Sequence, residues 1–152
     1  MRKIIFFFLA CFVTQHISAQ LLNSVVNVSP YFPSNEKLVN DAGDVTVSAA
    51  IEYPEGSYFR YNPAFQVDIT DTQIIIISGN TTVFAEATFN GWILEPVSGV
   101  KITEATLDPG SDLSPTVNLQ DGRVEINFAG IAGNGFSTTT INVSSELSLI
   151  HI

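Results

Sequence analysis

The sequence predicts an all-β protein, an antiparallel β-sandwich of the Ig-like or jelly-roll-like kind with eight to nine strands. Three observations lead to this prediction. Apolar and polar residues alternate with a period of two along several segments. Turn-forming residues separate those segments at short intervals. Helical periodicity is nearly absent, and only residues 33–41 could supply a single helical turn.

The alternating segments are the expected strands. In residues 45–53 and 65–69 every second residue is apolar, which buries one face and leaves the other in water. Residues 74–77 are four consecutive isoleucines, a pattern typical of a strand that is buried on both faces or that crosses between the sheets. Further strands are expected at residues 82–88, 116–120, 123–128 and 136–145.

Short polar segments are the expected turns. Residues 78–80 would join the isoleucine strand to residues 82–88 as a hairpin. Asp121-Gly122 would close a second hairpin, because a type I′ turn needs positive φ at both central residues. All seven prolines are expected between strands, since proline cannot donate a ladder hydrogen bond. Residues 139–145 carry no charge or proline, so we expect the last strand to be an edge that can pair with another chain.

The first nineteen residues read as an export signal. Arg2 and Lys3 precede an apolar run at residues 4–13, and Ala19 is the small residue that signal peptidase requires. The run is about half the roughly 20 residues that span a bilayer, so no transmembrane helix is expected in the mature chain. We therefore expect a signal peptide at 1–19 and a single domain at 20–152. The expected location is secreted or cell envelope, either extracellular or periplasmic.

Cys11 is the only cysteine, and two fates are open for it. Leu9-Ala10-Cys11 is a poor match to a lipoprotein processing site, because Phe8 stands where leucine is usual. Cleavage after Ala19 would instead remove Cys11 with the signal. The exported domain would then lack disulfides and depend on core burial alone.

Charge and composition exclude several functions. The chain has 15 acidic and 6 basic residues and a net charge of −9, which becomes −11 when Arg2 and Lys3 leave with the signal. Such a chain cannot replace the counterions of a phosphate backbone, so no nucleic acid is expected as a partner. His16 lies in the signal and His151 at the chain end, which leaves a Ser-His-Asp triad without its base. The sequence therefore predicts a protein that is not an enzyme.

Aromatic residues supply the first candidate binding site. Tyrosine and tryptophan rings stack on sugar rings, while arginine donates hydrogen bonds to hydroxyl groups. The candidate ligand-binding residues are Tyr53, Tyr58, Arg60, Tyr61 and Trp92. The alternative is that these rings fill one end of the sandwich core.

Paired acidic residues supply the second candidate site. Calcium prefers carboxylate and carbonyl oxygens, and the Pro-Gly turn between Asp108 and Asp112 would bring such groups together. Two further pairs are Asp41 with Asp44 and Asp68 with Asp71. For all of them the alternative is a solvated surface carboxylate.

Two glutamates raise a third possibility, a small glycoside hydrolase. Glu86 and Glu95 lie beside apolar or aromatic residues in the sequence, which can raise the pKa of a carboxyl group. The alternative for both is an outward-facing surface residue.

Three motifs in residues 67–143 resemble a known domain. They are Phe89-Asn90-Gly91-Trp92, Thr106-Leu107-Asp108-Pro109 and the strand Val-Glu-Ile-Asn-Phe-Ala-Gly-Ile at 124–131. The chain resembles a β-sandwich domain of secreted bacterial proteins, many of which carry a PEP-CTERM-type sorting tail. The resemblance implies export and an envelope or extracellular role, and it carries over no catalytic residue. No Pro-Glu-Pro or basic cluster follows Ser145, so sorting through that tail is not expected.

Together these features predict an exported, non-catalytic β-sandwich that acts as a cell-surface, matrix or adhesion module. The first alternative is a carbohydrate-binding module that uses the aromatic loop, and the second is the small glycoside hydrolase. Expected partners are a glycan, a surface protein or a second copy paired through an edge strand. No cofactor is expected apart from calcium at the acidic pairs.

Overall fold

The computed structural model describes residues 20–56 and 65–148, and every regular element in these ranges is a strand. One sheet contains β1 (Val25–Tyr31), β2 (Asp44–Thr46), β6 (Gly91–Ser98), β8 (Thr116–Gln120) and β9 (Arg123–Asn127). The other contains β3 (Phe65–Ile69), β4 (Gln73–Ser78), β7 (Val100–Leu107) and β11 (Ser137–Leu147). A small ribbon is formed by β5 (Thr82–Val83) and β10 (Ala132–Gly133).

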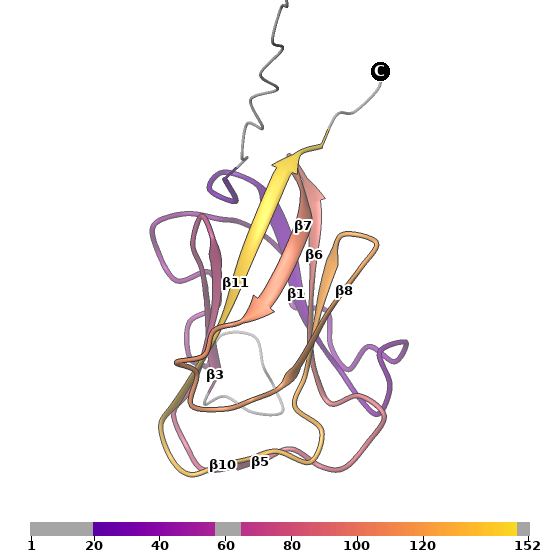
Figure 1. Ribbon diagram of the computed structural model, residues 1–152, viewed down its shortest axis with the longest axis vertical. Helices are drawn as coiled ribbons and strands as arrows, with labels where there is room; N and C mark the ends of the chain where they lie inside the picture. The colour runs from indigo at the N-terminus through magenta and orange to yellow at the C-terminus, as the bar shows by residue number, and fades with distance from the viewer. Residues whose placement is uncertain (1–19, 57–64, 149–152) are drawn as a thin grey trace, which may run out of the picture.

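The two sheets are antiparallel and pack as an unclosed sandwich (Figure 1). Their strand orders are β2-β1-β6-β9-β8 and β3-β4-β11-β7, and the ribbon of β5 and β10 lies at the end of the sandwich opposite the C-terminal end of β11. The predicted all-β sandwich is therefore confirmed, and the nine strands of the two sheets match the expected number. Residues 33–41 contain no helix, although the Lys37 N–H donates to the Ser34 carbonyl in a turn.

Alternation places the core between the inner faces of the two sheets. Phe65, Val67 and Ile69 of β3 are buried, whereas Gln66 and Asp68 between them are only half-buried. The isoleucine strand follows the same rule, because residues 74 and 76 are buried and residues 75 and 77 are half-buried. The expectation that β4 is buried on both faces was wrong, because its outer face is not fully covered.

Four aromatic rings join the two sheets at one end of the core. The Phe65 ring of β3 lies 4.7 Å from the Trp92 ring of β6, in an edge-on arrangement. Phe84 stacks on Phe128 at 4.7 Å, and Trp92 meets Phe128 edge-on at 5.3 Å. Edge-on and stacked pairs of this kind contribute about 0.5–1.5 kcal/mol each beyond the burial of their surface. The cluster thus fixes how the sheets face each other.

Two predicted strands and one predicted hairpin differ in the structure. The expected strand at 45–53 ends at Thr46, because Glu52 Oε1 accepts the Ser48 N–H and closes a turn. The expected strand at 82–88 is only β5, which pairs with β10. The predicted hairpin at 78–80 is also absent, since β4 already pairs with β3 on one side and β11 on the other. A further strand beside β4 has no free edge to join.

Two prolines lie inside strands, contrary to expectation. Pro30 belongs to β1 and Pro96 to β6. The Pro30 carbonyl accepts the Val39 N–H, so the edge of β1 at this residue faces the following loop, beyond the end of β2. Pro96 lies beyond the last residue of β6 that pairs with β9, Leu94. Each proline therefore costs no ladder bond, which is the condition for proline in a strand.

The C-terminal half follows the predicted turn but not the predicted edge. Asp121 and Gly122 have φ values of 53° and 82° and join β8 to β9 as the expected hairpin. The last strand, β11, lies between β4 and β7 and pairs with both. The prediction that residues 139–145 form a sheet edge was wrong, because β11 pairs with β4 on one side and with β7 on the other.

The Tyr53 hydroxyl gives the first test of this fold. It accepts the Val28 N–H at 3.1 Å and donates to the Gly43 carbonyl at 2.8 Å. Val28 lies one residue beyond the part of β1 that pairs with β2, so the hydroxyl replaces a missing ladder partner.

Replacing Tyr53 with Phe should lower the free energy of unfolding by about 1–3 kcal/mol, because a buried N–H is left without a partner. Chemical denaturation measures this change. Val83→Ala, at a side chain that is 74% exposed, is the control and should change stability by less than about 0.5 kcal/mol. Equal stability of Tyr53→Phe and the parent would contradict this role.

Candidate functional site

The aromatic candidates lie mostly in the core or outside the described residues. Tyr53 is fully buried and Trp92 is 4% exposed. Neither presents a ring face to solvent, so the prediction that these two form a binding surface is corrected. Both rings pack inside the sandwich, which was the alternative reading of the sequence. Tyr58, Arg60 and Tyr61 lie outside the described residues, and their part of the carbohydrate hypothesis stays a prediction.

The Asp108–Asp112 turn uses its carboxylates to hold the chain. Asp108 accepts the Gly110 N–H through Oδ1 at 2.8 Å and the Asn142 amide through Oδ2 at 3.0 Å. These two hydrogen bonds, the one from Asn142 foremost, lower the pKa of Asp108. Asp112 Oδ2 accepts the Thr138 N–H at 2.7 Å. The turn is thereby docked against β11.

Asp41, Asp44 and Asp71 of the other acidic pairs also accept hydrogen bonds within the fold. The Asn27 amide of β1 donates to Asp41 at 3.0 Å and to Asp44 at 3.1 Å. Donation from Asn27, and then from the Gly43 N–H, lowers the pKa of Asp41. Asp71 accepts the Leu22 N–H at 3.2 Å. Among the described residues no group of three or more His, Cys, Asp or Glu side chains could hold a metal ion. Calcium binding stays a prediction.

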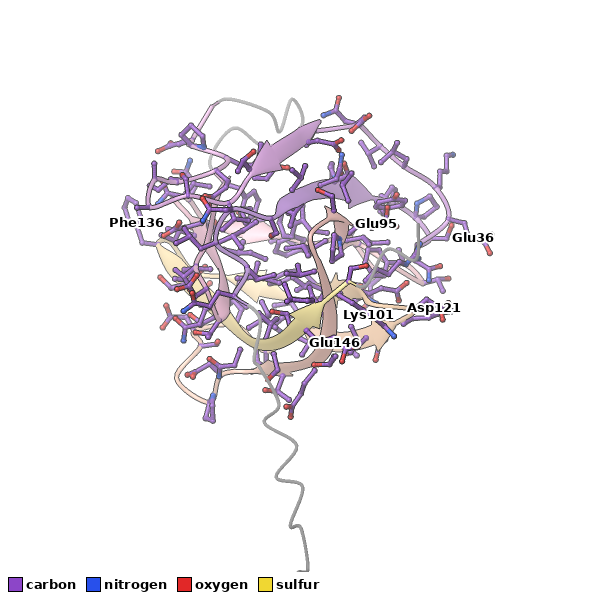
Figure 2. The ribbon with its side chains drawn as sticks, turned by 90° about the horizontal axis from the view of Figure 1, so that it is seen from above. Glu36, Glu95, Lys101, Asp121, Phe136 and Glu146 are labelled. Atoms are coloured by element: carbon purple, nitrogen blue, oxygen red, sulfur yellow. The ribbon has the colours of Figure 1, made fainter. Side chains whose placement is uncertain are left out.

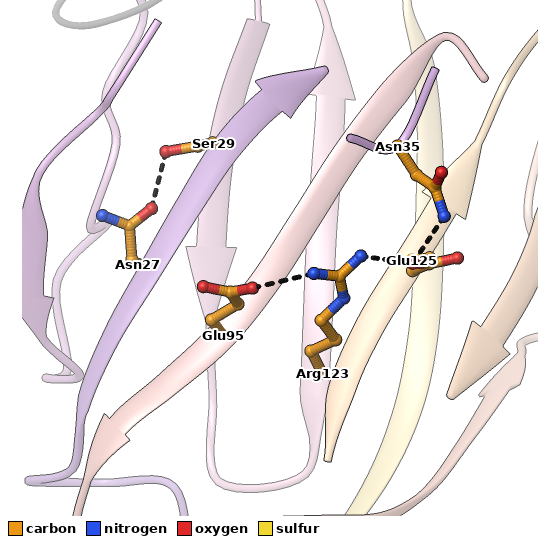
Figure 3. Close-up of polar contacts among 6 residues, drawn as sticks. All are labelled: Asn27, Ser29, Asn35, Glu95, Arg123 and Glu125. Atoms are coloured by element: carbon orange, nitrogen blue, oxygen red, sulfur yellow. Dashed lines mark hydrogen bonds and ion pairs between the residues drawn. The ribbon is translucent and has the colours of Figure 1, made fainter. Parts of the chain in front are cut away.

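The outer face of the five-stranded sheet carries a network centred on Arg123 (Figure 3). The guanidinium of this β9 residue contacts Glu95 of β6 at 3.3 Å and Glu125 of β9 at 2.7 Å. Glu125 is 5% exposed and also accepts the Asn35 amide at 3.1 Å. The hydrogen bond to Glu125 is the main cause that raises the pKa of Arg123. The network therefore ties β6 and β9 to the segment after β1.

That segment, residues 32–43, covers part of the outer face. Asn35 reaches Glu125, and the Ala42 N–H donates to the Ser29 hydroxyl of β1 at 3.1 Å. In the sheet, Ile93 of β6 lies between Ser29 and Glu125. Ile93 is 1% exposed although its position in the strand places it on the outer face. We attribute its burial to the segment that is anchored on both sides of it.

A pocket of about 320 Å³ adjoins this network at the end of the sandwich where β8 and β9 turn. Its lining includes two acidic residues, Glu95 and Asp121, and two basic ones, Lys101 and Arg123. Lys101 lies opposite Glu146 in the pairing of β7 with β11. Figure 2 shows Glu95, Lys101, Asp121 and Glu146 gathered on one side of the molecule. The pocket is therefore lined by equal numbers of acidic and basic side chains and carries no net charge of one sign.

The two glutamates of the hydrolase hypothesis contact different parts of the structure. Glu95 is paired with Arg123 on the outer face of the sheet. The Glu86 carboxylate lies beside Gly130, in the segment between β9 and β10. Trp92, the aromatic neighbour of Glu95 in sequence, has its ring in the core. The neighbours of Glu95 in the sequence are apolar or aromatic, but in the structure its carboxylate lies beside the Arg123 guanidinium.

Four strands form the edges of the two sheets, and three of them are protected. The edge strand β2 has only three residues. The edge of β3 is covered, because Tyr53 and Val67 exchange backbone hydrogen bonds of 3.0 and 2.9 Å. The edge strand β7 carries exposed Lys101 and Glu104 and faces a register shift in β11. Short length, cover, charge and bulges are the usual means of preventing edge-to-edge pairing.

The fourth edge, β8, has five residues, no charged side chain and no bulge, and it lies close to β7 of the other sheet. Its exposed side chains are Thr116, Asn118 and Gln120, all uncharged, and its pairing with β9 is regular. The Phe128 N–H donates to the Asn90 carbonyl, so alternate residues of β9 bond to β6 and those between them bond to β8. It follows that the N–H and C=O groups of Val117 and Leu119 point to the free side of β8. Sequence reasoning identified the hairpin but not this edge, because the order of the strands depends on contacts between distant residues.

Comparison with known proteins finds no family model, no curated protein and no solved structure that matches this chain. The resemblance to exported bacterial sandwich domains therefore stays a prediction, whereas the sandwich itself is shown. No helix in the described ranges is long and apolar enough to cross a membrane.

The Asp108 turn predicts how stability depends on pH. A lowered pKa in the folded chain stabilises it above the ordinary pKa of Asp, about 3.9, and this contribution is lost as the pH falls through the lower folded value. Asp108→Asn should therefore make the loss of stability below about pH 4 less steep. The change of stability with pH is measured as the midpoint of urea unfolding at several pH values between 6 and 2.5. Asn142→Ala, which removes the main donor but keeps the carboxyl group, should flatten it as well. An unchanged acid slope in both variants would contradict this assignment.

Proposed function

We propose that the chain is an exported, non-catalytic adhesion module in which β8 of one copy pairs with β8 of a second copy. The observation that supports this proposal is the uncharged, regular β8 edge, where the backbone groups of Val117 and Leu119 take no part in the pairing with β9. An exposed edge of this kind is a template for adding a strand from another chain. Pairing between copies on facing surfaces would join them by homophilic adhesion.

The geometry of β8 favours a second copy as the added strand. In an antiparallel arrangement about a two-fold axis, Val117 of one copy would lie opposite Leu119 of the other. The outward N–H and C=O groups of both residues would then all be bonded. On the exposed face, Asn118 would lie opposite Asn118, and Thr116 opposite Gln120. Cross-strand pairs of polar, uncharged residues are compatible with such a sheet.

Charge also favours this pairing. The exported chain, with a net charge of −11 after residues 1–19 are removed, repels its own copies, and contact is least costly where no acidic side chain lies at the interface. The exposed residues of β8 carry no charge, so no like charges would meet across the strand pair. Self-association through β8 should therefore become stronger as salt screens the net charge.

Charge placed at Asn118 tests this proposal. In the expected register the two Asn118 Cα atoms would be about 4.5 Å apart, so like charges there would repel. Asn118→Lys and Asn118→Glu should each weaken self-association by about tenfold or more, a cost on the order of 1.4 kcal/mol. Mixing the two variants should restore it, because opposite charges would then face each other. Analytical ultracentrifugation at several salt concentrations measures the dimer constant.

Ala85→Lys is the matched control, since residue 85 is exposed in the segment after β5 and away from β8. This variant should associate like the parent. A monomeric parent at all salt and protein concentrations would sink the proposal. Association of the mixture no stronger than that of each Asn118 variant alone would exclude this register.

A further inference from the structure

The loop between β10 and β11 holds an Asn-Gly dipeptide in an open position. Asn134 is exposed, and its side-chain amide makes no hydrogen bond with any described residue. Gly135 has a φ of 89°, and apart from its chain neighbours no described atom lies within 4 Å of the place where a Cβ would stand. The next residue, Phe136, is 84% exposed. The neighbouring structure therefore does not obstruct a change of conformation at this dipeptide.

A second Asn-Gly dipeptide, Asn90-Gly91, is held firmly. The Asn90 amide donates to the Ala85 carbonyl at 3.1 Å, and its N–H donates to Asn127 at 3.0 Å. Its carbonyl accepts the Phe128 N–H at 2.9 Å. Gly91 lies in β6, where an added Cβ would be 1.9 Å from the Ile126 carbonyl oxygen. The chain thus has one Asn-Gly dipeptide whose asparagine is held by hydrogen bonds and one whose asparagine side chain makes none with a described residue.

We infer that Asn134 is a site of spontaneous deamidation and that the fold protects Asn90 from the same reaction. The backbone nitrogen of Gly135 would attack Cγ of Asn134, forming an N–C bond and losing its proton. The bond from Cγ to Nδ2 would break, and ammonia would leave. One water molecule would then open the succinimide ring and give aspartate or isoaspartate. Glycine favours this step because it has no Cβ to obstruct the approach of its nitrogen.

Ring closure requires Cγ to move onto the next backbone nitrogen, which the two sites allow to different degrees. At Asn134 no hydrogen bond to a described residue has to break. At Asn90 the side-chain bond to Ala85 must break and the start of β6 must open locally. We therefore expect deamidation in the native protein to be at least about tenfold faster at Asn134 than at Asn90.

The product would change the surface beside Phe136. It would add a negative charge, and isoaspartate would lengthen the backbone by one carbon just before β11 begins at Ser137. Figure 2 shows Phe136 on the side of the molecule opposite Lys101 and Asp121. The modification therefore lies away from the turn that closes β8 and β9, and its test is independent of adhesion through β8.

Peptide mapping of the purified protein tests this inference. Cleavage after glutamate places Asn134 in residues 126–146 and Asn90 in residues 87–95, so mass spectrometry follows each site separately. After incubation at mildly alkaline pH, the native protein should show conversion of amide to carboxylate in the first peptide and little in the second. In urea at the same pH, both sites should react at similar rates.

Asn134→Gln is the control, because a longer side chain does not form the five-membered ring readily, and it should abolish the change in residues 126–146. The inference is overturned if Asn134 stays intact in the native protein while it reacts in urea. Equal rates at Asn90 and Asn134 in the native protein would also overturn it, since the fold would then offer Asn90 no protection.

Discussion

An open sandwich must satisfy the backbone groups at the edges of both its sheets, and most of this structure can be understood from that constraint. The Tyr53 hydroxyl and backbone serve two edges at once, since one bonds Val28 of β1 and the other covers Val67 of β3. Glu52 extends this cover by accepting the Ile69 N–H at 2.8 Å. Charge protects β7. Among the edges of the described sheets, β8 carries no charged side chain and pairs with no further segment, although β7 lies close to it.

The Arg123 network explains how the position of β8 is fixed although β8 is an edge strand. Arg123 and Glu125 belong to β9, the single partner of β8, and they tie β9 to β6 and to the segment after β1. Breaking a buried ion pair costs far more than losing an exposed one, and Glu125 is nearly fully buried. The strand that supports β8 is therefore held from the outer face, while the aromatic cluster holds the sheets together from inside.

Local patterns in the sequence predicted the strands whose two faces differ in polarity, such as β3, β8 and β9. They missed β6, because Ile93 is buried on the outer face by residues 32–43 and the alternation is lost. They also misplaced Tyr53 and Trp92, since ring content does not tell whether an aromatic residue faces a ligand or the core. The order of the strands depends on contacts between distant residues, so no local pattern could show that β11 is central and β8 an edge.

Amide hydrogen exchange followed by NMR tests the central claim, that β8 offers free backbone groups to a second copy. In dilute solution the amides of Val117 and Leu119 should exchange rapidly, whereas Asn118, bonded to β9, should be protected. At concentrations where the protein associates, protection should appear at Val117 and Leu119 and nowhere else on the outer edges. Protection of Val117 and Leu119 equal to that of Asn118 in the monomer would contradict the account, because the edge would already be occupied.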